Sequence, residues 1–277
     1  MDNIHTRQID TSYDLDQFNN SELENTQITP PPPSKVETPV ASHSTKPEEK
    51  SKKLTVVFCI PGNAFSNNFL LCWTELLGYC LNNNITPILS NATDSNVFFV
   101  RNKCLMGNFL NGLSQKPFQG KVDYDYIMWI DSDQVFTVEM FKRLLSHDKD
   151  IISGMYMMKD MNNFAIVPEM KAEDLLKNGS FKFLDKDTLI EWKKENENKP
   201  LMSVDYCGMG FMLMKKGLLE QLEYPWFQPL TTTITDASNN VVVQDYNSED
   251  HYLCKRMKDL GYEIFVDTDI LVGHEKK

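Results

Sequence analysis

The sequence predicts an α/β fold with a mostly parallel sheet flanked by helices. Short apolar runs rich in β-branched residues alternate with segments whose apolar residues recur at helical spacing, which is the order of a doubly wound sheet. The first run, LTVVFCI at residues 54–60, is followed by Pro61 and Gly62, as a buried parallel strand is followed by its exit turn. This alternating region, residues 54–277, is long enough for one large core.

The remaining elements follow from the same signals. Ser66, Thr137 and Ser248 each stand where a helix N-cap is expected, and Gly261 ends the last of these helices. Residues 124–130 become apolar toward their end, so we place this strand inside the sheet. The predicted strands are 54–60, 85–89, 124–130, 151–158, 204–214 and 263–266, and the predicted helices are 66–80, 97–110, 137–146 and 248–260.

Two parts of the chain lie outside this pattern. Residues 1–53 hold 6 of the 13 prolines, four of them in a row at 30–33, and none of the 12 glycines. Such a composition predicts a disordered tail with a short polyproline stretch. Residues 160–200 are rich in Lys, Glu and Asn, and we interpret them as a polar insertion or lid with one or two short helices.

The charge of the chain argues against whole classes of partner. Lys and Arg number 28 and Asp and Glu 39, which gives a net charge of −11. The chain therefore has no general attraction to nucleic acid or to anionic membranes. A nucleotide site would have to obtain positive charge locally, from a metal ion, an Arg or a helix N-terminus.

The sequence also predicts a cytoplasmic protein. The first ten residues, MDNIHTRQID, contain no apolar signal-peptide core, and no run reaches the ~18 apolar residues of a membrane span. The six cysteines form no C-x-x-C pair and most lie within apolar runs, so we expect reduced thiols in the core.

The acidic triplet Asp131-Ser132-Asp133 follows the third strand directly and is the first candidate site. Carboxylates two residues apart on an extended chain point to the same side, and hard oxygen donors there suit Mn²⁺ or Mg²⁺. The alternative is a polar turn that stops the strand. On its own this short motif has little specificity.

Other metal-dependent families fit the triplet less well. An EF-hand loop is excluded, because Val135, Phe136 and Lys142 stand where two ligands and the turn glycine are required. A phosphatase of the haloacid-dehalogenase type remains an alternative, with Asp131 as nucleophile and Asp133 as acid and base. That motif is expected near the start of a domain, whereas here it follows three strands, and the later acidic pair in DTD at 267–269 has the wrong pattern.

A longer series of motifs resembles the glycosyltransferases of the GT-A fold. WIDSDQVF resembles their metal-binding D-x-D, and CGMGFMLMKK and YPWF resemble the acceptor-side strand and the segment after it. The segment SEDHYLCKRMKDLGYEIFVDTDILVGH resembles their acidic helix, the following strand and a closing His. The chain is most similar to small transferases of family-2 type, including those of phages and viruses, over roughly residues 54–277.

The resemblance implies a role for each acidic residue. Asp131, Asp133 and His274 would hold Mn²⁺ or Mg²⁺, and a mixed carboxylate and imidazole set favours Mn²⁺. Asp250 would be the general base that deprotonates the acceptor hydroxyl, and Glu249 would assist it. The alternatives are a surface His near the C-terminus and two acids that stabilise a helix dipole.

The resemblance also implies a donor side and an acceptor side. On the donor side, Arg101 and Asp131 would contact the nucleotide, and Pro61 and Gly62 would let the backbone approach it. An exposed helix Arg and an ordinary turn are the alternatives. On the acceptor side the candidates are Gly208, Trp226 and Phe227, which could instead be a bulge and two core aromatics. We interpret four further residues as structural: Cys207, Cys254, His147 and His251.

The expected function is therefore a metal-dependent glycosyltransferase that uses a nucleoside diphosphate sugar, with UDP first among the donor nucleotides. The base at Asp250 favours inversion, although retention stays open. The acceptor could be a glycan, a lipid, a protein or a modified base. A non-catalytic module that binds a sugar nucleotide or a glycan is the alternative from another class.

Overall fold

A computed structural model describes residues 53–275, except 198, 236–237 and 239. The predicted N-terminal tail lies outside the described residues, apart from Lys53. The helices are α1 (Asn67–Asn82), α2 (Val97–Cys104), α3 (Val138–Ser146), α4 (Ala172–Asn178), α5 (Lys186–Glu195) and α6 (Glu249–Asp259). The strands are β1 (Leu54–Pro61), β2 (Ile85–Ala92), β3 (Tyr126–Ile130), β4 (Gln134–Val135), β5 (Ile151–Met155), β6 (Ile166–Val167), β7 (Leu201–Val204), β8 (Tyr206–Cys207), β9 (Phe211–Lys215), β10 (Leu230–Thr235), β11 (Val241–Asn247), β12 (Ile264–Leu271) and β13 (Gly273–His274). Short 3₁₀ turns occur at Phe109–Asn111, Pro117–Gly120 and Leu219–Gln221.

The centre of the fold is a seven-stranded sheet in the order β2-β1-β3-β9-β5-β12-β7. Strands β2, β1, β3, β5 and β12 run in one direction, while β9 and β7 run against their neighbours. The predicted α/β class with a mostly parallel sheet is therefore confirmed. Because parallel strands end at the same edge, the residues after β1, β3 and β5 come together there.

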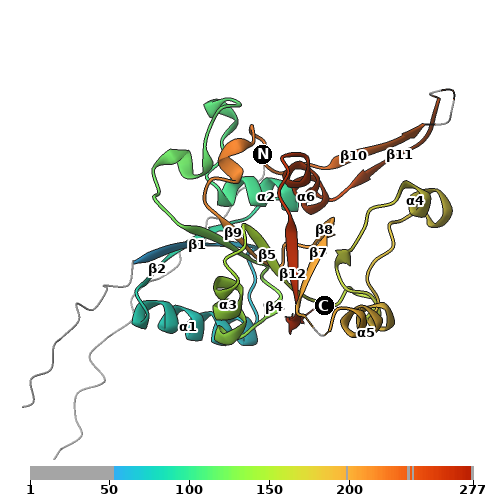
Figure 1. Ribbon diagram of the computed structural model, residues 1–277. Helices are drawn as coiled ribbons and strands as arrows, with labels where there is room; N and C mark the ends of the chain where they lie inside the picture. The colour runs from blue at the N-terminus through green and yellow to red at the C-terminus, as the bar shows by residue number, and fades with distance from the viewer. Residues whose placement is uncertain (1–52, 198, 236–237, 239, 276–277) are drawn as a thin grey trace, which may run out of the picture. The chain divides into compact units, whose positions relative to one another are not determined.

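Helices cover both faces of the sheet (Figure 1). Helices α1 and α3 pack on one face, where Phe69, Leu76 and Phe141 belong to the same buried cluster as Phe58 of β1. Helices α2 and α6 contribute to the cluster on the other face, with Trp129 of β3 among its members. The alternation of side chains along β1 and β3 explains the two clusters, because successive residues point to opposite faces.

Two predicted helices begin as their capping residues indicate. Ser66 Oγ accepts a hydrogen bond from Phe69 N at 3.0 Å, and Thr137 Oγ1 accepts one from Met140 N at 3.3 Å. The insertion at 160–200 contains two short helices, α4 and α5, within the expected range. All six cysteines are free and five of them are buried, as expected of core thiols.

The largest differences from prediction concern three parts of the chain. Helix α2 ends at Cys104, not near residue 110, because the chain turns at Leu105 and Met106, where Met106 adopts a positive φ of 58°. The single strand predicted at 204–214 is three separate strands, β7, β8 and β9, interrupted at 205 and 208–210. The hairpin of β10 and β11, which extends outward from beside α6 in Figure 1, was not predicted at all.

Candidate functional site

Arg101 forms the centre of the candidate site. It lies on α2 and is 2 % exposed, so the alternative of an exposed helix Arg is wrong. Its Nε donates to Glu249 Oε1 at 2.9 Å, and its Nη1 lies 3.2 Å from Asp131 Oδ1. The guanidinium also lies over the ring of Trp129, 5.4 Å from its centroid. One buried cation thus joins the end of β3 to the start of α6.

The charges around Arg101 do not cancel. In their ionised forms Asp131, Glu249 and the neighbouring Asp250 bring three negative charges to one guanidinium. Burial opposes the charge on Arg101, but Asp131 and Glu249 hold its pKa above the ordinary value. Burial raises the pKa of Glu249, although the charge of Arg101 opposes this. Three carboxyl groups thus share one buried guanidinium.

Asp250 stands at the start of α6 within a set of donors. Its Oδ2 accepts a hydrogen bond from Tyr206 Oη at 3.0 Å, and its Oδ1 accepts from His251 N at 2.9 Å and from Ser248 Oγ. Burial raises the pKa of Asp250, but the hydrogen bonds from His251 and Ser248 outweigh burial and hold it below the ordinary value. Asp250 is therefore an ionised carboxylate at neutral pH.

Asp133 and His274, two of the three predicted metal ligands, lie against each other. His274 Nε2 lies 3.1 Å from Asp133 Oδ2, and its Nδ1 lies 2.9 Å from the carbonyl oxygen of Met157. A carbonyl can only accept, so Nδ1 carries the proton, and in the neutral imidazole the lone pair of Nε2 faces the carboxylate. Histidine ligands of metals are commonly oriented in this way.

The three predicted metal ligands are not assembled around one point. Among the described residues, no three His, Cys, Asp or Glu side chains are grouped so that they could hold a metal ion. The expectation that Asp131 and Asp133 point to the same side of an extended chain is wrong, because a turn closed by Gln134 N and Asp131 O separates them. Asp131 faces Arg101, whereas Asp133 faces His274.

The predicted donor-side backbone lies against the acidic turn. Gly62 has a φ of +132°, and a Cβ there would lie 2.7 Å from Ser132 Oγ, so only glycine allows this approach. Pro61 is the last residue of β1 and pairs with Ala92 of β2. A hollow of about 250 Å³ lies beside the turn and is lined by Ala64, Phe65, Ser66, Ser132, Asp133 and Glu275.

The predicted acceptor residues pack closely against other parts of the chain. Trp226 and Phe227 are both 0 % exposed, and Phe227 packs edge-on against Trp129, so the expected stacking on a sugar ring is wrong for this conformation. A Cβ at Gly208 would lie 2.0 Å from Tyr156 Oη, so this glycine makes room for Tyr156 and leaves none for an acceptor. Burial favours the core alternative for Trp226 and Phe227, although Phe227 also lines an aromatic hollow described below. Gly208 lies between β8 and β9, where it closely approaches Tyr156.

The later acidic residues lie apart from the site. Asp267 is 0 % exposed and contacts Arg143 Nε at 2.5 Å and His147 Nε2 at 2.7 Å. Asp269 pairs with Arg143 and Lys193. Both carboxylates thus have structural partners, which disfavours the phosphatase alternative and confirms a structural role for His147.

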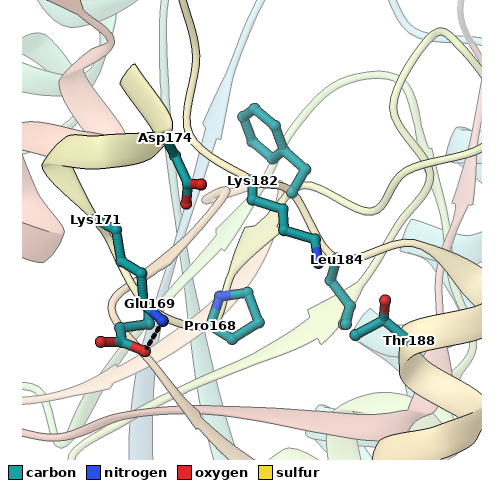
Figure 2. Close-up of a pocket in the computed structure, with 8 residues that line it drawn as sticks. Pro168, Glu169, Lys171, Asp174, Lys182, Leu184 and Thr188 are labelled. Atoms are coloured by element: carbon teal, nitrogen blue, oxygen red, sulfur yellow. Dashed lines mark ion pairs between the residues drawn. The ribbon is translucent and has the colours of Figure 1, made fainter. Parts of the chain in front are cut away.

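Two further hollows lie outside the carboxylate cluster. One, of about 250 Å³, lies in the insertion (Figure 2), where Lys171 and Glu169 form an ion pair on its wall. The other, of about 580 Å³, is mainly aromatic and lies between α2 and residues 224–228. Neither is lined by Asp131, Asp133, Glu249, Asp250 or His274.

Sequence reasoning missed the two tyrosines nearest the carboxylates. Tyr156, which follows β5, stacks edge-on against His274 at 5.1 Å, and its hydroxyl accepts from Gly210 N at 3.3 Å. Tyr206 donates to Asp250. The glycines of CGMG were the available signal, because small residues in a strand indicate that another group approaches closely.

Comparison with known proteins adds little to this description. No protein-family model and no curated protein matches the chain. Among solved structures, the crystal structure of A197 from STIV matches with a TM-score of 0.46 and 16% identity, over 81% of this chain and 87% of that one. Among the described residues, no helix has both the length and the apolar character that a membrane crossing requires.

Proposed function

We propose that this chain is a metal-dependent glycosyltransferase that moves a sugar from a nucleoside diphosphate sugar to an acceptor hydroxyl with inversion. The observation that carries the proposal is the grouping of Asp131, Glu249 and Asp250 around the buried Arg101, at the edge where the parallel strands end. Strand ends of this kind are where open α/β sheets bind their ligands.

The donor set of Asp133 and His274 fits a divalent cation. Nδ1 of His274 donates to a carbonyl, so Nε2 of the neutral ring and Oδ2 of Asp133 face each other as two acceptors. Such a pair is stable when a cation lies between the two atoms or when Nε2 is also protonated. Asp131 Oδ1 lies 3.2 Å from Arg101 Nη1 without a hydrogen bond among the described residues, so Asp131 would have to turn away from Arg101 to join Asp133 and His274 as a ligand. Imidazole with carboxylate favours Mn²⁺ over Mg²⁺.

These residues would hold the cation beside the diphosphate, where a bound Mn²⁺ supplies electrostatic stabilisation to the leaving group. Gly62 packs closely against Ser132 of the same turn, and the hollow beside this turn, lined by Ser132 and Asp133, is where we place the nucleotide. We place UDP first among the donor nucleotides. Arg101 is already paired with Asp131 and Glu249, so we assign it to positioning these carboxylates and no longer to direct contact with the nucleotide.

The residues around Asp250 supply the acceptor-side chemistry. Asp250 takes the proton of the acceptor hydroxyl as that oxygen forms its bond to the anomeric carbon, and the bond from this carbon to the diphosphate oxygen breaks. The electron pair leaves with the nucleoside diphosphate. The low pKa of Asp250 keeps it in the basic form at neutral pH. Glu249 holds Arg101, which keeps the start of α6 beside β3.

Release of nucleoside diphosphate from UDP-, GDP-, CDP-, ADP- and dTDP-sugars, with Mn²⁺ and with excess chelator, tests the proposal. We expect turnover with one nucleotide that the chelator abolishes. Asp250→Asn should reduce kcat by about 10²–10⁴-fold, the usual contribution of a general base. Asp123→Asn is the matched control, because the Asp123 side chain is 96% exposed.

The same experiment separates an enzyme from a binding module. A non-catalytic module would bind a sugar nucleotide and release no diphosphate, and its Asp250→Asn variant would bind equally well. No turnover with any of the five donor classes, on a panel of sugar and alcohol acceptors, would contradict the proposal.

A further inference from the structure

The carboxylate of Asp250 is held asymmetrically. Its Oδ1 accepts from His251 N and Ser248 Oγ, whereas its Oδ2 accepts from Tyr206 Oη at 3.0 Å. A carboxylate oxygen has two lone pairs, so among the hydrogen bonds of the described residues Oδ2 retains one for another donor. The atom that Tyr206 contacts is therefore the one that can receive a proton.

Tyr206 is in turn held by a set of aromatic rings. It is 6 % exposed and stacks on His251, with ring centroids 3.7 Å apart and planes inclined by 11°. Phe183 packs edge-on against Tyr206 at 6.1 Å, and Phe181 stacks on His251 at 5.7 Å. Both phenylalanines belong to the insertion, and Phe183 also lines the insertion pocket of Figure 2.

We propose that Tyr206 is a positioning residue that orients Oδ2 of Asp250 toward the acceptor hydroxyl, and that Phe183 of the insertion holds Tyr206 in that orientation. The proposal rests on the function proposed above. It gives the insertion a role in the transfer step, because two of its aromatic side chains contact the rings that support the base.

Other groups near Asp250 must be considered when its titration is measured. Tyr206 and Cys207 face it from β8, and Tyr156 faces it from the segment after β5. Arg101 faces it from α2, and Glu249 and His251 are its neighbours on α6. A hydrogen bond to the charged form lowers a pKa, so loss of the Tyr206 hydroxyl should raise the pKa of Asp250.

The test is the pH profile of kcat for Tyr206→Phe, which keeps the stacked ring and removes the hydroxyl. We expect kcat on the plateau to fall about tenfold or more, as for loss of a hydrogen bond to a charged group. The acidic limb should move to higher pH, and KM for the donor should stay unchanged. Phe183→Leu should change kcat in the same direction by a smaller factor.

Tyr252→Phe is the matched control. Tyr252 lies on α6, is 9 % exposed, and its hydroxyl accepts from Arg256 at 3.3 Å, so the variant loses a comparable group without touching Asp250. Its pH profile should equal that of the wild type. If Tyr206→Phe keeps both the plateau and the acidic limb of the wild type, Tyr206 has no positioning role.

A second measurement does not depend on turnover. Denaturant unfolding of Tyr206→Phe, Asp250→Ala and the double variant should show a coupling of about tenfold in the unfolding constant. If the effects of the two single substitutions on the unfolding free energy simply add in the double variant, the proposed contact is overturned, even in a chain with no transferase activity. If the wild type turns over and Tyr206→Phe has the same kcat profile, this inference alone is overturned. If the wild type does not turn over, the proposed function on which the inference rests is overturned.

Discussion

Arg101 shows how one buried residue can organise a site. Its guanidinium contacts Glu249 and Asp131, which are separated from it by 148 and 30 residues in the sequence. Such a pair contributes little net stability relative to an apolar replacement, but removal of one partner leaves a buried charge uncompensated. The candidate site therefore depends on Arg101 whether or not this side chain contacts a ligand.

Arg101→Met should lower the free energy of unfolding by about 3–5 kcal/mol, because Glu249, at 6 % exposed, would keep a buried charge without its partner. Urea unfolding followed by circular dichroism measures the change. The double variant Arg101→Met with Glu249→Gln is the control, and we expect it to recover part of the loss. A loss below about 1 kcal/mol for the single variant contradicts this account of the pair.

At the scale of single residues, the sequence predicted which residues lie in the site better than it predicted where their side chains point. Arg101, Asp131 and Asp250 all lie in the site, because Asp131 follows a strand, Asp250 begins a helix and Arg101 lies within a helix that the periodicity locates. The separate directions of Asp131 and Asp133 depend on a turn that two-residue spacing cannot reveal. The burial of Trp226 depends on packing between distant segments, which local sequence does not encode.

At the scale of elements, Asp205 connects three parts of the fold. Its Oδ2 accepts from Met170 N of the insertion at 2.9 Å, and its Oδ1 lies 2.9 Å from Lys258 Nζ on α6. Burial raises the pKa of Asp205, but the hydrogen bonds from Lys258 and Met170 outweigh it and hold the pKa below the ordinary value. Asp205 therefore links the insertion to the helix that carries Asp250.

A carboxyl group whose pKa is lower in the folded state stabilises the fold at pH values above its unfolded pKa, which is about 3.9 for Asp. This stabilisation is lost as the pH falls through the folded pKa. Asp205→Asn should therefore lower the unfolding free energy at pH 7 by about 1–2 kcal/mol. The difference from the wild type should shrink below pH ~4. Denaturant unfolding from pH 3 to pH 7 measures it, and a difference independent of pH contradicts the assigned cause.

Elements were predictable where local signals and tertiary packing agree. Helices α1 and α3 have a capping hydroxyl and an apolar face, and both formed as expected. The hairpin of β10 and β11 escaped prediction because its exposed threonines, such as Thr231 and Thr233, give no apolar face of the usual kind. The strand at 204–214 is broken because Tyr156 fills the space that the glycines leave.

At the scale of the whole molecule, residues from distant parts of the sequence meet at one edge of the sheet. Gly62 follows β1, Asp131 follows β3, Tyr156 follows β5 and His274 comes shortly after β12. The alternation of strands and helices in the sequence predicts this meeting, because parallel strands end at a common edge. Because these residues meet at one edge, we expect that edge to bind a nucleoside diphosphate together with a cation.

Thermal unfolding with UDP, GDP, CDP, ADP and dTDP, each with and without Mn²⁺, tests that claim most directly. A ligand at about 100 times its Kd adds roughly 2.7 kcal/mol, and each kcal/mol raises the midpoint of a domain of this size by about 2–4 °C. The baseline is the chain with Mn²⁺ alone, and the matched variants are Asp133→Asn and the exposed Asp123→Asn.

We expect one nucleotide to raise the midpoint by several degrees in the presence of Mn²⁺, an effect that Asp133→Asn abolishes and Asp123→Asn retains. If no nucleotide raises the midpoint, or if Asp133→Asn responds as the wild type does, the claim of a metal-dependent nucleotide site at this edge of the sheet is contradicted.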